Sequence, residues 1–231
     1  MRRTRTTIAT TAGTALIGVG LALPTGATAA TAAAPDACAD ASSSCRIVSR
    51  ADVDGDGAAD SVGQTTWGTK ITTRLATADG EKTHVVTELE YVPGSGYYGA
   101  ARIDGEDGYE IVTRTSLGAH TAYHQVLTYR DGKLKTLKDP RNRYRWVTDG
   151  SVWSSAGYQK TTTATGAFTF VSRQAIDSDR DGDFTLYTVS AGWNSTDRTW
   201  RRMGTSSRYD VSPEVASRYS WWNVPYLPRG I

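Results

Sequence analysis

The amino-acid sequence predicts an all-β protein, and three observations support this fold class. Short runs rich in Thr, Val, Tyr and Trp recur from Ile47 onward, separated by turns that contain Gly and Asp. After the N-terminal segment, only a weak helical period over Pro213–Tyr219 interrupts this pattern. An acidic loop also occurs three times, each time directly before a strand-like run. We therefore expect mostly antiparallel strands in the folded part of the chain.

Six runs have the strongest strand character. Two turn sequences, Ala78–Gly80 and Arg130–Lys133, contain the Asp-Gly pair that is typical of β-hairpins. The expected strands are Thr69–Leu75, His84–Leu89, Ile111–Thr115, Tyr123–Tyr129, Phe168–Arg173 and Phe184–Val189.

Residues 1–29 have the features of a signal peptide. A basic start at Arg2, Arg3 and Arg5 precedes an uncharged stretch rich in Ala, Gly and Leu, and Ala27–Ala29 offers the small residues that a signal peptidase recognises. A retained membrane anchor is the alternative, but the stretch is short for a span and no second apolar run follows it. We therefore expect cleavage before Ala30 and a secreted, extracellular protein without a membrane span.

Charge and length limit the partners of the mature chain. The sequence contains 26 Lys and Arg against 24 Asp and Glu, and three of the arginines lie in the signal peptide, so 23 basic residues remain and the net charge becomes −1. No basic stripe is left to neutralise a phosphate backbone, which argues against a nucleic-acid partner. About two hundred residues suffice for one all-β domain or two small ones. We expect a monomer in which residues 46–231 form the folded part.

The only two cysteines, Cys38 and Cys45, lie close together in the sequence. In an oxidising compartment this spacing favours a local disulfide, which would stabilise the domain only modestly because the loop it closes is short. The surrounding segment 30–45 is rich in Ala and Ser and has no strand or helix period. We therefore expect a flexible lead-in that carries this disulfide.

The first acidic loop has the pattern of a calcium site. Its carboxylates stand at positions 1, 3, 5 and 9, and Gly57 at position 6 allows a tight turn. Carboxylates this close together repel one another unless a cation lies among them, and oxygen ligands without His or Cys favour Ca²⁺ over zinc or copper. A solvated turn without a metal is the alternative. The expected ligands are Asp52, Asp54, Asp56 and Asp60, together with the carbonyl oxygen of Ala58.

A helix–loop–helix calcium hand does not fit this loop. That motif needs a bidentate Glu at position 12, where this chain has Gly63, and helices on both sides. Here the flanking segments Cys45–Arg50 and Ser61–Thr66 have strand character instead. The loop is therefore expected to connect two strands.

The acidic loop belongs to a repeat. Residues 51–62 align without a gap with residues 101–112, and a third copy occupies residues 175–186. The first copy, Asp52–Asp60, has the pattern D-x-D-x-D-G-x-x-D and so resembles the loop of the FG-GAP or VCBS repeat, which is integrin-like. This resemblance implies antiparallel blades, here as a partial or divergent β-propeller, with calcium in the loop and an extracellular binding or adhesion role. It covers residues 46–135 well and the rest of the mature chain poorly.

The second copy lacks the first aspartate. Arg102 stands at position 1, whereas Asp104, Glu106 and Glu110 keep acidic groups at positions 3, 5 and 9. A guanidinium among carboxylates can supply the charge that an ion supplies elsewhere. We therefore expect this loop to bind no calcium, with Arg102 neutralising it.

The third copy keeps most of the pattern. Asp177, Asp179 and Asp181 stand at positions 1, 3 and 5, but Thr185 replaces the acid at position 9. One carboxylate fewer predicts a lower affinity unless Asp183 or a water molecule completes the coordination shell. We expect a second calcium site here, formed by Asp177, Asp179, Asp181 and Asp183, with a solvated turn as the alternative.

Other side chains give weaker indications. His120 and His124 are four apart in an expected strand, where their rings would point the same way about 13 Å apart, too far for one zinc ion. No sequence motif marks a catalytic residue. The C-terminal half is rich in Trp and Tyr, which predicts either core packing or an exposed platform for sugar rings or peptide.

These features together predict a secreted calcium-binding β-repeat module that binds another macromolecule or a glycan and is not an enzyme. The alternative is a secreted hydrolase of carbohydrate or phosphate esters in which calcium has a structural role. A purely structural protein of the cell envelope is a third hypothesis.

Overall fold

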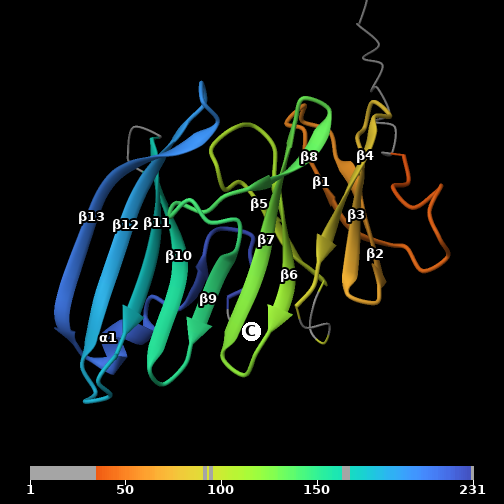
Figure 1. The fold of residues 1–231 in the computed structure, drawn as a ribbon. Coiled ribbons are helices and arrows are strands. Elements are labelled where there is room, and N and C mark those ends of the chain that lie inside the picture. The colour runs from red at the N-terminus through yellow and green to blue at the C-terminus, as the bar shows by residue number, and fades with distance from the viewer. Residues whose placement is uncertain (1–34, 91–92, 94–95, 163–166, 230–231) are drawn as a thin grey trace, which may run out of the picture. The chain divides into compact units, whose positions relative to one another are not determined.

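The computed structural model describes residues 35–90, 93, 96–162 and 167–229, and this part of the chain is all-β as predicted (Figure 1). Its strands form two sheets that are antiparallel apart from one short parallel pair, and neither sheet closes into a barrel. The expected signal peptide, residues 1–29, lies outside the described residues. No helix within the described residues is long and apolar enough to cross a membrane.

The first sheet is a four-stranded meander, called meander 1 below. Its strands follow one another in sequence order and pair antiparallel throughout. The first acidic loop joins its first two strands. The strands are β1 (Arg46–Ala51), β2 (Asp60–Trp67), β3 (Lys70–Ala76) and β4 (Lys82–Glu88).

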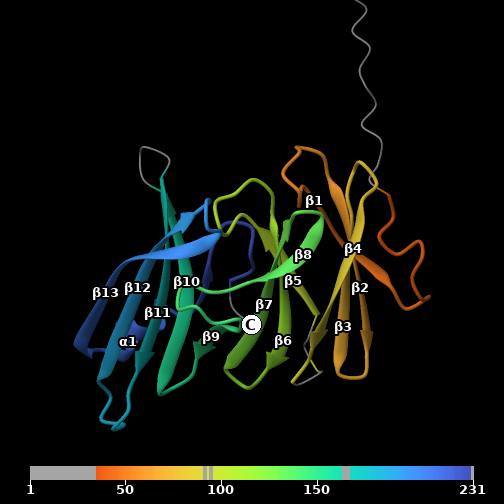
Figure 2. The ribbon, with the colours of Figure 1, turned by 45° about the horizontal axis from the view of Figure 1, so that its top comes forward.

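The second sheet contains two further meanders. Meander 2 comprises β5 (Gly96–Ala101), β6 (Glu110–Leu117), β7 (Thr121–Arg130) and β8 (Lys133–Leu137). Meander 3 comprises β10 (Ser154–Thr162), β11 (Phe168–Ile176), β12 (Phe184–Asn194) and β13 (Thr199–Val211). The strand β9 (Trp146–Gly150) pairs with β7 and β10 and so connects them (Figure 2). The short strand β14 (Trp221–Asn223) pairs with β10.

All six strands expected from the sequence are present, each within a few residues of its expected ends. The weak helical period corresponds to the short helix α1 (Pro213–Ser217). The expected turn at Asp131-Gly132 joins β7 to β8, with φ angles of 55° and 72°. Two positive φ angles are characteristic of the two-residue hairpin turn that matches the twist of the strands.

Meander 2 is buried on both faces. Neighbouring residues of a strand point to opposite sides of the sheet, and here both members of such neighbouring pairs are fully buried. Ile111 and Leu127 pack with residues of meander 1, whereas Val112 and Val126 pack with residues of meander 3 and with β9 and β14. Two successive cores therefore hold the three meanders together, with meander 2 as the shared layer.

The core between meanders 2 and 3 is strongly aromatic. Trp146 is fully buried, stacks against Trp222 with a centroid distance of 5.5 Å and lies 4.8 Å from the ring of Tyr158. Trp146 Nε1 donates a hydrogen bond to the carbonyl oxygen of Leu137 at 2.8 Å. Trp146, Tyr158 and Trp222 therefore serve core packing, whereas Tyr144, Trp153 and Tyr226 are exposed.

His124 belongs to this core rather than to a metal site. Its ring lies edge-on to Tyr98 at 4.8 Å and to Trp222 at 5.4 Å, and neither ring nitrogen has a hydrogen-bond partner among the described residues. Burial, and then the nearby Arg114, lower the pKa of His124 to about 3. The ring is therefore neutral at physiological pH.

The Cys38–Cys45 disulfide is present as predicted. It lies against β2, where a Cβ atom added to Gly63 would come within 2.7 Å of Cys38 Sγ. The amide of Ala37 donates to Ser61 Oγ at 3.1 Å, and Lys82 forms an ion pair with Asp40 at 2.5 Å. The described part of the lead-in, from residue 35, is thus attached to meander 1.

Candidate metal-binding loops

The first acidic loop brings together three of its expected ligands. Carboxylate oxygens of Asp52, Asp54 and Asp56 lie within 4.8 Å of one another, close enough for one metal ion. Each of the three also accepts a backbone N–H from within the loop, from Gly55 at 2.8 Å, Asp56 at 3.1 Å and Ala58 at 2.7 Å respectively. These bonds curl the backbone so that alternate side chains converge on one point.

Asp60 has a different contact pattern from the other three. Its Oδ2 accepts the amides of Val53 at 2.6 Å and Asp54 at 3.1 Å, and its Oδ1 accepts the amide of Ala78 at 2.9 Å. The side chain is fully buried. Asp60 therefore fixes the start of the loop to the strand that follows it and to the β3–β4 turn, and it is not a member of the converging group of three. The contact observed for Ala58 is its amide on Asp56, not one through its carbonyl oxygen.

The triad of Asp52, Asp54 and Asp56 concentrates negative charge. Partial burial, and then the carboxylates of Asp60, Asp56 and Asp52, raise the pKa of Asp54 to about 6, although the Asp56 amide opposes this shift. A cation among these oxygens would favour the ionised form.

The third acidic loop, between β11 and β12, forms the second triad. Carboxylate oxygens of Asp177, Asp179 and Asp181 lie within 4.8 Å of one another. Asp177 is buried and accepts the amides of Arg180 at 2.7 Å and Gly182 at 3.0 Å, whereas the other two side chains are exposed. Asp183 is not part of this group and donates its amide to Asp181 Oδ1 at 2.9 Å. Both triads could hold a metal ion.

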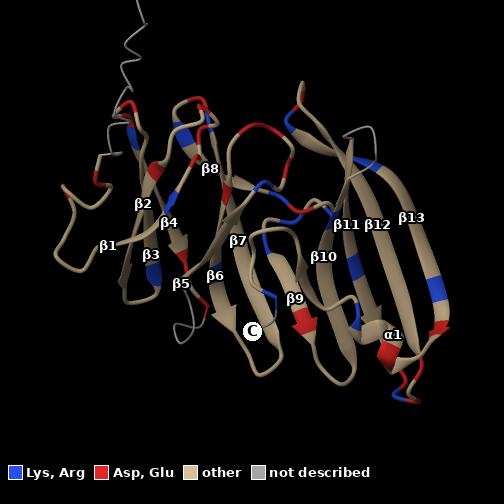
Figure 3. Ribbon diagram, turned by 180° about the vertical axis from the view of Figure 1, so that it is seen from behind, with Lys and Arg blue, Asp and Glu red and all other residues tan. Residues whose placement is uncertain are grey.

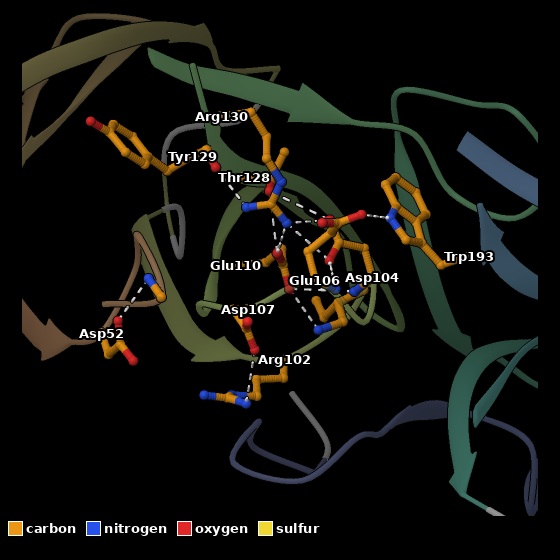
Figure 4. Close-up of polar contacts among 12 residues, drawn as sticks. Asp52, Arg102, Asp104, Glu106, Asp107, Glu110, Thr128, Tyr129, Arg130 and Trp193 are labelled. Atoms are coloured by element: carbon orange, nitrogen blue, oxygen red, sulfur yellow. Dashed lines mark hydrogen bonds and ion pairs between the residues drawn. The ribbon is translucent and has the colours of Figure 1, made fainter. Parts of the chain in front are cut away.

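The second acidic loop, between β5 and β6, contains a guanidinium instead of a third acidic triad. Arg130, at the end of β7, places Nη2 at 3.1 Å and 2.9 Å from the two carboxylate oxygens of Asp104 and at 3.5 Å from Glu110 Oε1 (Figure 4). Glu110 Oε2 accepts the amide of Ile103 at 2.6 Å, as Asp60 does for Val53 in the first loop. All of these acidic groups are almost fully buried, and the Arg130 side chain is 11 % exposed. An internal cation therefore balances part of the loop's charge.

The expectation that Arg102 neutralises this loop is wrong. The Arg102 side chain is about half exposed, stands 5.5 Å over the ring of Tyr109 and approaches the exposed Asp107 at 4.0 Å. Position 1 directs its side chain outward here, and the guanidinium among the buried carboxylates comes from a strand 28 residues later. A charge-assisted hydrogen bond needs a donor that is held in place, and Arg130 is held by its second contact, to the carbonyl oxygen of Tyr129 at 2.6 Å.

One guanidinium faces two buried carboxyl groups in this loop. Burial, and then the neighbouring Asp104, raise the pKa of Glu110 to about 8, although the amide of Ile103 and Arg130 oppose this shift. Burial also raises the pKa of Asp104, although Arg130 opposes this. Thr128 Oγ1 donates a hydrogen bond to Glu110 Oε1 at 3.2 Å. At neutral pH one of the two carboxyl groups therefore keeps its proton.

The first and second loops contact each other through their backbones. The amide of Tyr109 donates to the carbonyl oxygen of Asp52 at 2.8 Å. A Cβ atom on Gly108, whose φ is +98°, would lie 2.4 Å from the Val53 carbonyl oxygen, and one on Gly55 would lie 2.7 Å from Asp107 Cβ. Glycine at both positions therefore permits the close approach that joins meander 1 to meander 2 at this edge.

The sequence did not indicate the residues that complete the second loop. Arg130 stood in an expected hairpin turn, and nothing in its spacing connects it to an acidic loop about twenty residues earlier. Trp193 of β12 is another such residue, because its Nε1 donates to Glu106 Oε1 at 2.6 Å (Figure 4). An acidic repeat that lacks its first aspartate was the only sequence feature that pointed to an internal cation.

Comparison with known proteins identifies no relative of this chain. No family model matches the chain, and neither the curated proteins nor the solved structures contain a match. The FG-GAP or VCBS resemblance therefore stays a prediction that rests on the residues of the first loop.

Proposed function

We propose that the protein is a secreted β-repeat module that binds Ca²⁺ in its first and third acidic loops and uses the stabilised scaffold to bind an extracellular ligand. The observation that carries this proposal is the contrast among the three loops. Two of them gather three carboxylates within 4.8 Å, whereas the second has an arginine between its acidic groups. A buried or crowded acidic group needs a counter-charge, and an ion supplies it where no arginine does.

Calcium is the cation that best suits both loops. Each triad offers hard carboxylate oxygens without sulfur or nitrogen ligands, and two of the three side chains in the third loop are exposed, so water can complete the shell. The disulfide accords with an oxidising, extracellular compartment where free calcium is abundant enough for sites of modest affinity. In this proposal the three meanders are blade-like repeats, each with one loop of this type.

Calorimetric calcium titration of the mature protein tests the proposal. We expect two sites in the unchanged protein, loss of one site in Asp54→Asn and loss of the other in Asp179→Asn. Asp107→Asn is the matched control, because it removes an exposed carboxylate from the second acidic loop and should leave both sites intact.

Thermal unfolding gives an independent measurement. Calcium at a hundred times its dissociation constant should stabilise the folded state by about 2.7 kcal/mol for each site, and a chelator should reverse this gain. A melting temperature that is the same in chelator and in excess calcium, with no heat of binding, would show that the triads are solvated turns.

A further inference from the structure

A cleft of about 580 Å³ lies between meander 2 and meander 3. One wall consists of the end of β7, β8 and the segment that follows β8, and the other consists of the end of β12, the turn after it and the start of β13. This volume is in the range of pockets that bury most of a small ligand. None of the residues of the two acidic triads lines it.

The two walls are held in place by hydrogen bonds and ion pairs. Trp200 Nε1, on β13, donates to the carbonyl oxygen of Lys138 at 2.6 Å, and Arg198 pairs with Asp131 of the β7–β8 turn at 2.6 Å. Trp193 packs edge-on to Trp200 at 5.1 Å, and its own Nε1 is bonded to Glu106 of the second acidic loop. The cleft is therefore preformed, and the second loop supports one of its aromatic residues.

The lining carries more positive than negative charge. Lys135 and Arg198 share the single carboxylate of Asp131, and Lys138 and Arg202 form no ion pair with any described residue. Lys135 lies on β8 and Lys138 directly after it, whereas Arg198 lies in the turn before β13 and Arg202 on β13. Figure 3 shows where Lys and Arg occur along the ribbon.

The one acidic residue of the lining does not offset this charge. Asp139 is fully buried and already paired with Arg143 at 2.6 Å, and it also accepts a hydrogen bond from the hydroxyl of Tyr158 at 3.1 Å. An anionic ligand would therefore meet cations that have no carboxylate of their own.

The cleft also offers rings and hydroxyl groups. Tyr144 is 62 % exposed, with Lys138 Nζ 4.7 Å from its ring centroid, and Trp193 and Trp200 are partly exposed. Polar side chains that can exchange hydrogen bonds with a hydroxylated ligand line the same space, namely Thr136, Asn142 and Thr199. Apolar ring faces, hydroxyl partners and unpaired cations thus occur together in one preformed site.

We propose that this cleft binds a short segment of an anionic saccharide, a chain of sugar rings that carries carboxylate or sulfate groups. The apolar faces of the sugar rings pack on the aromatic side chains, their hydroxyls bond to the threonines and Asn142, and their acidic groups meet Lys138 and Arg202. An acidic peptide would use the cations alone. A nucleotide concentrates its charge at one end, in its phosphate or polyphosphate chain, whereas the cations here come from separate strands and turns on both walls.

This proposal names the ligand of the binding role proposed above, but it depends on no calcium-binding residue. Arg130 links the two parts of the molecule, since it lines the cleft and also holds the buried carboxyl groups of the second loop. The second loop binds no ion in our proposal, and its arginine instead becomes part of the wall of the ligand site.

Calorimetric titration with an oligogalacturonate tests the proposal. The fully methyl-esterified oligosaccharide is the matched ligand, because it keeps the sugar rings and removes the charge. We expect the acid to bind at least about tenfold more tightly than the ester, and its affinity to fall with added salt. The double variant Lys138→Ala/Arg202→Ala should weaken binding of the acid by about tenfold or more and leave that of the ester nearly unchanged.

The control variant Lys133→Ala/Arg208→Ala also removes one lysine and one arginine, but from exposed positions on β8 and β13 outside the cleft lining. It should bind the acid as tightly as the unchanged protein does. A sulfated oligosaccharide, compared with its desulfated form, distinguishes sulfate from carboxylate as the acidic group. Failure of both acids to bind, with and without calcium, would overturn the proposal. So would binding of the ester as tight as that of the acid, or tighter binding of ATP or polyglutamate.

The titrations are run both in calcium and in chelator, so that the two proposals fail separately. If the protein binds calcium but neither the oligogalacturonate nor the sulfated oligosaccharide, the proposed ligand site is wrong and the proposed metal sites stand. A protein that binds the saccharide in chelator and shows no heat with calcium retains the ligand site without the metal sites.

Discussion

The guanidinium of Arg130 lies 2.9 Å from Asp104 Oδ2 and 3.5 Å from Glu110 Oε1, inside the loop that corresponds to the two acidic triads. A single positive charge therefore serves two buried carboxyl groups. Burial, and then the charge of Asp104, raise the pKa of Glu110 to about 8, so this carboxyl group keeps its proton at neutral pH. Arg130 and one carboxylate form the ion pair, while the other carboxyl group acts as a neutral hydrogen-bonding partner.

Arg130→Met should destabilise the protein by roughly 3–5 kcal/mol, because it leaves a buried carboxylate without its partner. Glu110→Gln should change the unfolding free energy by no more than about 1 kcal/mol at or below about pH 4.5, where the carboxyl group is protonated in both states and an amide can replace it in its hydrogen bonds to Ile103 and Thr128. Urea unfolding measures Arg130→Met at neutral pH and Glu110→Gln at this lower pH. Equal losses in the two variants would show that Glu110 is not the neutral partner.

The buried Glu110 also predicts how stability depends on pH. Its pKa is raised from 4.5 to about 8, so the folded protein binds this proton more tightly than the unfolded chain does. The resulting stabilisation is complete below about pH 4.5 and is lost as the pH rises toward about 8. Unfolding free energies measured across this range should fall in the unchanged protein and fall less in Glu110→Gln. A slope that the substitution leaves unchanged would assign the pH dependence to other groups.

His124 predicts the opposite slope at lower pH. Burial lowers its pKa from 6.5 to about 3, so the unfolded chain binds this proton more tightly. The stability associated with the neutral ring is present above about pH 6.5 and is lost as the pH falls toward about 3. The loss should be on the order of 4 kcal/mol at the acid end.

His124→Phe keeps an aromatic ring between Tyr98 and Trp222 and should remove this part of the acid sensitivity, measured by urea unfolding at a series of pH values. His84→Phe is the control, because His84 lies in β4 outside this aromatic core and the change should leave the acid slope intact.

Gly108→Ala tests the contact between the first and second loops. The new methyl group would lie 2.4 Å from the carbonyl oxygen of Val53, and the residue would keep a φ of +98°. Gly80→Ala is a matched control, since Gly80 has the same φ and no atom within 4 Å of the added carbon. We expect Gly80→Ala to cost about 1 kcal/mol from backbone strain and Gly108→Ala to cost about 2–4 kcal/mol more. Denaturant unfolding compares the two, and equal costs would show that the loops separate easily.

The all-β class, the six strongest strands, the disulfide and the two converging triads could be predicted from the sequence. These features depend on local chemistry, such as alternating β-formers, Asp-Gly turns and carboxylates two residues apart. A converging triad needs only a curled backbone, which the loop supplies through its own amides. Local patterns were therefore sufficient for Asp52, Asp54 and Asp56 and for their counterparts in the third loop.

The roles of Asp60, Arg130 and Trp193 could not be predicted in this way. Asp60 reaches Ala78 in another turn, Arg130 reaches back from β7 to the β5–β6 loop, and Trp193 reaches that loop from β12. Each contact depends on which strands become neighbours, and local sequence patterns do not reveal that arrangement. The cleft is likewise formed by segments about sixty residues apart that meet only in the folded chain.

The hydrogen bond from the Tyr109 amide to the Asp52 carbonyl oxygen joins an expected metal ligand to the second acidic loop. Asp52 thus faces the acidic triad with its side chain and the neighbouring loop with its main chain. A graft that transplants the first loop alone into another scaffold would lose the support of residues 107–109. Engineering of a portable calcium site from this protein therefore has to transfer both loops as one unit.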